Sequence, residues 1–350
     1  MSELVLIAAD IFAAASDVPQ RARGLALPLL SHIARYGTVE PLPAGWRAWL
    51  AGWLGREELA SAAPASIAGA AMRAPGEPQR QFLWLADPVH LIVGPTSVHL
   101  SPNGTLALDA AAQQALAAAF DFTFARSGYA LEPLRGGRFL LSGPAPSGEV
   151  RAMEPARALG TRIADPLPRG RGASALRALG AEIEMWLHEH PLNVRRVREN
   201  RPPISTLWLW GGGAPLGADA WRSGNGSPSA AVFGDDGFME GLARLCGAHF
   251  AAEAPAPGAL AGAGAPRRIV ALELLRSAES PPQREPLAAF SPLAALEQFE
   301  RQWVAPALEQ LKAGDLTRLT ILVNDRALAF GARDRFKLWR RPRAAFAELR

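Results

Sequence analysis

The stretch that decides the fold is Glu184-Met-Trp-Leu-His-Glu-His-Pro-Leu-Asn-Val-Arg-Arg196, followed by Ile204-Ser-Thr-Leu-Trp-Leu-Trp-Gly-Gly-Gly213. The first part has the apolar spacing of a helix and ends in imidazole, amide and guanidinium side chains. Pro191 favours a helix end there, because it disfavours the helical conformation of the preceding residue. The second part is a continuous apolar run that stops at three glycines, a pattern typical of a buried strand.

The composition indicates a globular protein of two domains, with 350 residues of which 49% are hydrophobic. The net charge is only +4, and the basic residues are scattered apart from Arg195–Arg201 and Lys337–Arg343, so we expect no nucleic-acid partner. The single cysteine, Cys246, excludes an internal disulfide and lies in an apolar helical pattern, which predicts a buried thiol.

The N-terminal segment Met1–Asp10 lacks the basic start of a signal peptide. No run approaches the roughly 18 consecutive apolar residues that span a membrane. We therefore expect a cytoplasmic protein without a membrane partner.

Helix and strand patterns predict an α/β fold. Short apolar runs that suit strands buried on both faces of a parallel sheet occur at Leu4–Ala8, Ile204–Trp210, Ala230–Phe233, Ile269–Leu274 and Leu319–Val323. Apolar residues at helical spacing occur at Leu25–Tyr36, Leu108–Phe124, Ala173–His188, Gly237–Cys246 and Leu293–Lys312. Asp235 and Asp236 directly precede one of these helices, where carboxylates act as N-cap and first-turn charge.

The order of elements predicts an inserted domain. Between the two ends of the chain the pattern changes to strand-strand-helix-strand-strand, which indicates a small α+β domain. We expect an α/β core of residues 1–40 and 203–350, an inserted α+β domain of residues 80–202, and a helix with a linker at 41–79. Within that last segment, Ala60–Pro78 is rich in Ala, Pro and Gly and is predicted to be an exposed linker.

The glycines at 211–217 fit no nucleotide-binding motif. The dinucleotide fingerprint requires glycine at position 216, which is Leu216, and a phosphate loop requires a lysine that this segment lacks. Two interpretations remain open: the backbone approaches a ligand or another segment of the chain closely, or it makes a tight turn with positive φ.

The two histidines at 188 and 190 are not spaced for a shared metal on one helix, because residues i and i+2 point apart; a metal would need further ligands. We predict instead a polar cluster of His190, Asn193 and Arg196 that holds an anion through paired guanidinium donors. The alternative is an interdomain hydrogen-bond network, and the residues favour neither. The candidate ligand-binding residues are His188, His190, Asn193, Arg196, Gly211, Gly212 and Gly213.

The run from His190 to Gly213 resembles the HPxNxxR…PxNxxWxWGxG signature of the archaeal-type 2,3-bisphosphoglycerate-independent phosphoglycerate mutases and their bacterial relatives, some labelled RpfE-type regulatory proteins. Trp84–Leu91, Leu296–Pro306 and Trp339–Arg341 resemble the bacterial group more weakly. The resemblance implies an alkaline phosphatase-like parallel-sheet core with an inserted α+β domain. It also implies, for active members, two metal ions such as Mn or Zn held by Asp and His around a phosphorylated serine.

The chain departs from that family pattern at the implied metal and nucleophile positions. Asp10 and Asp325 are the only candidate metal ligands that the resemblance leaves, because the late Asp-His pair appears as Asp325-Arg326. The nucleophile segment appears as Trp46–Gly55, which contains no serine. We therefore expect a catalytically degenerate relative without a metal cofactor, with a binding or regulatory role toward a phosphorylated small molecule or a protein partner. The alternatives are an active Mn- or Zn-dependent mutase or phosphotransferase in which His190, Asp10 and Asp325 converge, and a structural interaction protein without a ligand site.

Overall fold

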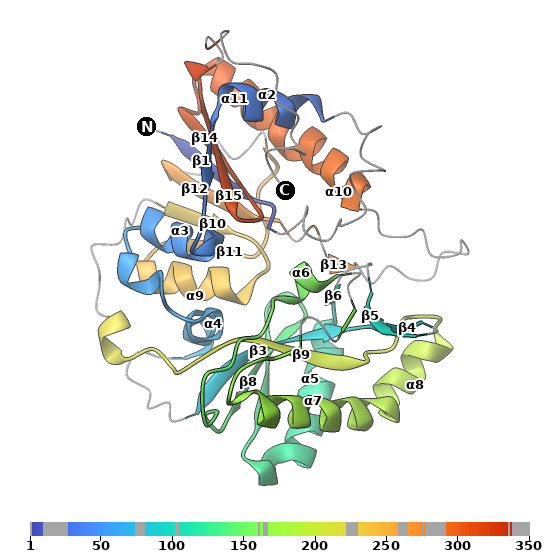
Figure 1. The fold of residues 1–350 in the computed structure, drawn as a ribbon. Coiled ribbons are helices and arrows are strands. Elements are labelled where there is room, and N and C mark those ends of the chain that lie inside the picture. The colour runs from blue at the N-terminus through green and yellow to red at the C-terminus, as the bar shows by residue number, and fades with distance from the viewer. Residues whose placement is uncertain are drawn as a thin grey trace. The chain divides into compact units, whose positions relative to one another are not determined.

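The computed structural model describes residues 2–9, 27–73, 81–94, 96–101, 105–159, 162–163, 167–221, 230–257, 265–272, 274, 276–277, 292–334 and 337. The chain divides into two compact units, shown in Figure 1. The first unit comprises residues 1–61, 220–274 and 291–350, and the second comprises residues 62–219 and 275–290.

The first unit is built on a seven-stranded sheet with the strand order β11-β10-β12-β1-β14-β15-β2. The strands are β1 (Glu3–Ile7), β2 (Thr38–Pro41), β10 (Ala230–Phe233), β11 (His249–Ala251), β12 (Arg267–Ala271), β14 (Arg318–Val323) and β15 (Arg326–Gly331). All pairings from β11 to β14 are parallel, whereas β15 pairs antiparallel with both β14 and β2. The predicted α/β class with a mostly parallel sheet is confirmed.

Helices cover both faces of this sheet, as expected for apolar strands such as β1 that are buried on both sides. In Figure 1, α2, α10 and α11 group on one side, and α3 and α9 on the other. Their bounds are α2 (Pro28–Tyr36), α3 (Gly45–Trp53), α9 (Gly237–Cys246), α10 (Pro292–Phe299) and α11 (Ala305–Ala313), with a π-helical turn at Glu300–Val304. Asp236 is the N-cap of α9, because its Oδ1 accepts a hydrogen bond from the Met239 amide at 3.0 Å, which confirms the predicted role.

The second unit contains a four-stranded antiparallel sheet in the order β7-β8-β3-β9. Its strands are β3 (Phe82–Val89), β7 (Ala130–Leu134), β8 (Arg138–Gly143) and β9 (Thr206–Gly213), and a separate hairpin is formed by β4 (Leu91–Val93) and β5 (Val98–Leu100). A short pairing joins β6 (Thr105–Leu106) to β13 (Arg276–Ser277). The helices are α4 (Pro64–Met72), α5 (Ala110–Phe124), α6 (Pro155–Ala158), α7 (Ala173–His188) and α8 (Pro191–Arg198).

Alternation of side chains along β3 gives the second unit three layers. Trp84 and Ala86 belong to a buried cluster with residues of α5 and α7. Leu83 points to the opposite face, toward Gly69 of α4. A Cβ added to Gly69 would lie only 2.9 Å from Leu83 Cδ1. The sheet therefore lies between α4 and the pair α5 and α7. Among all the described residues, no helix combines the length and the apolarity needed to cross a membrane.

Three sequence-based expectations need correction. Ile204–Trp210 was expected in the parallel core sheet, but β9 pairs with β3 in the second unit. Part of the predicted linker Ala60–Pro78 is the helix α4, in which Ala65–Ala70 are buried. The helix α8, which begins at Pro191, is an additional element that the sequence analysis did not predict. The longer segment of the second unit accordingly runs from residue 62 to residue 219, which differs from the expected limits of 80 and 202.

Candidate functional site

His190 begins the helix α8 as its N-cap. Its backbone is extended, and its Nδ1 accepts a hydrogen bond from the Leu192 amide at 3.1 Å. The ring packs edge-on against Trp186, with the centroids 4.9 Å apart. Burial lowers the pKa of His190, so the ring is neutral at pH 7 and carries its proton on Nε2. His190 as the N-cap and Pro191 as the first helical residue therefore both stabilise the start of α8.

Asn193 connects three segments of the backbone around α8. It is 4% exposed, and its Nδ2 donates to the carbonyls of Leu187 at 2.7 Å and Ile204 at 2.8 Å. Its Oδ1 accepts from the Ile204 amide at 2.8 Å. Both donors of the side-chain amide are therefore used within the chain.

Arg196 is buried on the same helix, with 2% of its surface exposed. Its Nε donates to the Pro202 carbonyl at 2.8 Å, which ties α8 to the bend before β9. Burial, reinforced by the nearby Arg201, lowers the pKa of Arg196 to about 10, so the side chain remains a cation at neutral pH. The contacts of His190, Asn193 and Arg196 favour a hydrogen-bond network within the second unit as their role, and anion binding by them stays a prediction.

The three glycines at the end of β9 allow close packing inside the second unit. Gly211 has a φ of 61°, which favours glycine. A Cβ on Gly212 would lie 2.1 Å from the Trp84 ring, and one on Gly213 would lie 2.3 Å from the Cβ of Ala63. At Gly212 and Gly213 the backbone thus approaches other segments of the chain closely, which is one of the two interpretations left open, and Gly211 has the positive φ named in the other.

His188, the last residue of α7, is exposed and lines a cavity of about 690 Å³ together with Asn193. His190, Arg196 and the three glycines do not line it. The remaining lining residues are Leu91, Val93, Val98, Glu184, Val194, Val197, Arg198, Pro203, Ile204 and Ser205. Sequence reasoning missed this set, although the spacing of Glu184 and His188, one helical turn apart, was a signal.

Of the two predicted metal candidates, Asp10 lies outside the described residues. Asp325 is exposed in the two-residue turn that joins β14 to β15, where Asn324 has a φ of 48°. In the part of the chain that the structure describes, no group of three or more His, Cys, Asp or Glu side chains is placed to hold a metal ion.

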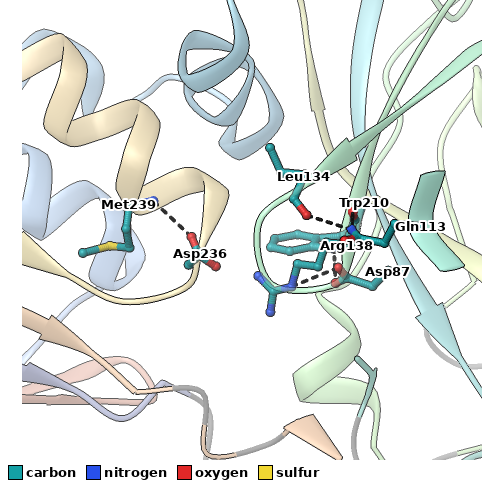
Figure 2. A network of polar contacts seen from close by, with 7 residues as sticks. All are labelled: Asp87, Gln113, Leu134, Arg138, Trp210, Asp236 and Met239. Carbon is teal, nitrogen blue, oxygen red and sulfur yellow. Dashed lines mark hydrogen bonds and ion pairs between the residues drawn. The ribbon is translucent and has the colours of Figure 1, made fainter. Parts of the chain in front are cut away.

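Figure 2 shows a polar network in the second unit that sequence reasoning also missed. Asp87 on β3 is fully buried, and its Oδ2 accepts a hydrogen bond from Trp210 Nε1 at 2.8 Å. Its Oδ1 lies 3.1 Å from Arg138 Nε in an ion pair. Gln113 of α5 donates to the carbonyls of Leu134 at 2.9 Å and Arg138 at 2.6 Å. The signal for this network was an acidic residue inside an apolar strand, and its contacts join β3, β7, β8, β9 and α5.

Cys246 is a buried thiol of α9, as predicted. Burial raises its pKa to about 11, so it is protonated and unreactive at neutral pH.

Comparisons with known proteins agree with the resemblance to the 2,3-bisphosphoglycerate-independent phosphoglycerate mutases. No family model matches the chain. It is 26% identical over 183 residues to the mutase of that name from Methanosarcina acetivorans, a match that covers 50% of this chain and 46% of the relative. It is 29% identical over 177 residues to the mutase from Methanothrix thermoacetophila, covering 47% and 44%. The chain thus spans less than half the length of these curated relatives.

Solved structures give a more distant similarity. A cofactor-independent phosphoglycerate mutase from Thermoplasma acidophilum is 17% identical, with a TM-score of 0.40 over 94% of this chain and 89% of that chain.

Proposed function

We propose that this protein is a catalytically degenerate relative of the 2,3-bisphosphoglycerate-independent phosphoglycerate mutases, and that it binds a phosphorylated small molecule in a regulatory role. On this proposal it groups with the bacterial relatives labelled RpfE-type regulatory proteins. The support is the sequence match to the mutases over half of the chain, together with an α/β core of mostly parallel strands.

The observation that carries the proposal is the residue after Asp325. The resemblance places Asp325-Arg326 where the mutases have an Asp-His metal pair. Arg326 is the first residue of β15, at the carboxyl end of β14, and it is half-buried. A guanidinium has no lone pair with which to bind a metal, but it donates paired hydrogen bonds to phosphate. The carboxyl ends of parallel strands are also where α/β folds bind ligands.

The contacts of the mutase-like segment support the same proposal. His190 caps a helix, and both amide donors of Asn193 bind backbone carbonyls. These contacts connect α7, α8 and the segment before β9, which is a structural role that does not require mutase chemistry.

Thermal unfolding of the full chain with 3-phosphoglycerate tests this proposal. We expect the melting temperature to rise by about 3 °C at a ligand concentration ten times Kd, with or without Mn²⁺. Arg326→Gln should reduce the rise. Arg318→Gln is the matched control and should keep it, because Arg318 is exposed at the opposite end of β14.

Two results would contradict the proposal. One is a melting temperature that 3-phosphoglycerate leaves unchanged. The other is a rise that depends on stoichiometric Mn²⁺ and is accompanied by formation of 2-phosphoglycerate, which would indicate an active mutase.

A further inference from the structure

The proposed function does not use the cavity beside α7 and α8, which lies within the second unit. Its walls come from the hairpin β4–β5, from both helices and from the segment before β9. Its volume of about 690 Å³ is typical of sites that bind metabolite-sized molecules.

The cavity gathers exposed apolar side chains. Val93 is 80% exposed, Val197 is 56% exposed and Val194 is 43% exposed, and all three line it. Valines that keep so much surface in water on one concave wall would gain free energy from an apolar ligand that covers them.

The charged groups of the cavity lie on two different helices. Glu184 and His188 are one turn apart on α7, and Arg198 is the last residue of α8, about 10 Å along the helix axis from its start at Pro191. Glu184 is an exposed residue that lines the apolar cavity. Partial burial raises the pKa of the Glu184 carboxyl.

We propose that this cavity binds an apolar organic cation, a primary amine with a hydrocarbon body. Its ammonium group pairs with the Glu184 carboxylate, and its body covers Val194 and Val197. A neutral imidazole has one acceptor nitrogen, so His188 in that form can accept a second hydrogen bond from the ammonium group.

A cation fits better than an anion for an electrostatic reason. A carboxylate beside apolar walls attracts an ammonium group, whereas it repels an anion.

Titration of the full chain with octylamine, followed by calorimetry, tests the proposal. We expect Glu184→Gln to weaken octylamine binding by about fourfold, the effect of one partly exposed ion pair. Arg195→Gln is the matched control, an exposed charge on α8 that does not line the cavity, and should leave binding unchanged. Val197→Asn should also weaken binding, because it places a polar group under the hydrocarbon body.

Octanol and octanoate have the same hydrocarbon chain as octylamine but a different charge. Comparing the three ligands separates the contribution of the charge from that of the hydrocarbon chain. We expect both to bind more weakly than octylamine. Octanol binding as tightly as octylamine would remove the role of charge, and tighter binding of octanoate would identify an anion site. Absence of octylamine binding, or full affinity in Glu184→Gln, would also overturn the proposal.

Discussion

Asn193→Ala is the substitution that most sharply separates a scaffold role from a ligand-binding role in the α7–α8 segment. The side chain is buried and satisfies three backbone groups: the carbonyls of Leu187 and Ile204, and the amide of Ile204. Alanine leaves all three without their partner.

The size of the effect follows from these three bonds. A buried polar group without its partner costs about 1–3 kcal/mol, and water that enters the vacated space recovers part of that loss. Taking the lower limit for each group, we expect the free energy of unfolding of the second unit to fall by about 3 kcal/mol. With a urea dependence of about 2 kcal/mol/M, the unfolding midpoint would fall by about 1.5 M.

Urea unfolding measures the loss, and hydrogen exchange locates it. The Ile204 amide should exchange faster in Asn193→Ala, because its acceptor is removed. Arg195→Ala is the matched control on the same helix: Arg195 is exposed, so we expect a change within about 0.5 kcal/mol. The reasoning would be refuted if the two variants had the same midpoint and the Ile204 amide kept its protection.

Three further predictions concern other parts of the chain. Gly212→Ala places a Cβ 2.1 Å from the Trp84 ring and should lower stability by about 2 kcal/mol, while Gly217→Ala, with nothing within 4 Å, should be nearly neutral; equal urea midpoints would contradict this. Burial raises the pKa of Glu300, so the stability it contributes is present below the ordinary glutamate pKa and is lost as pH rises through the folded-state value. Glu300→Gln should therefore flatten the fall in urea midpoint as the pH rises above the ordinary glutamate pKa, and an unchanged slope would count against that assignment. The Cys246 thiol, with a pKa of about 11, should react with an aromatic disulfide at least about 100-fold more slowly in the native protein than in urea, and comparable rates would show that it is accessible.

Elements with a strong local pattern could be predicted from the sequence. The helix Ala173–His188 was predicted with the bounds that the structure has, and so were Gly237–Cys246 and Ala230–Phe233. Each combines apolar residues at one clear spacing with a recognisable end, such as Pro191 or Asp236.

Features that depend on distant partners could not be predicted. An apolar strand such as β9 has the same pattern in either sheet, and only its pairing with Phe82–Val89 assigns it to the second unit. The helix α4 has the Ala-, Pro- and Gly-rich composition of a linker, and its burial becomes evident only with β3 and β9 beside it.

Only part of the candidate site could be predicted, because the site also depends on segments that are distant in the sequence. His188 and Asn193 line the cavity, but its opposite wall comes from Leu91, Val93 and Val98, nearly a hundred residues earlier in the chain. Asn193 was predicted as a ligand-binding residue because its side chain is polar. Its bonds to Leu187 and Ile204 depend on how the chain bends between α7 and β9, which no local pattern specifies.

Phosphorus NMR of the full chain incubated with 3-phosphoglycerate and Mn²⁺ or Zn²⁺ tests the central claim most directly, with the Methanosarcina acetivorans relative run alongside as the positive control. We predict no 2-phosphoglycerate beyond the amount formed without protein. Conversion to 2-phosphoglycerate that requires bound metal and is lost in Asp325→Ala would contradict the claim that this protein binds but does not catalyse.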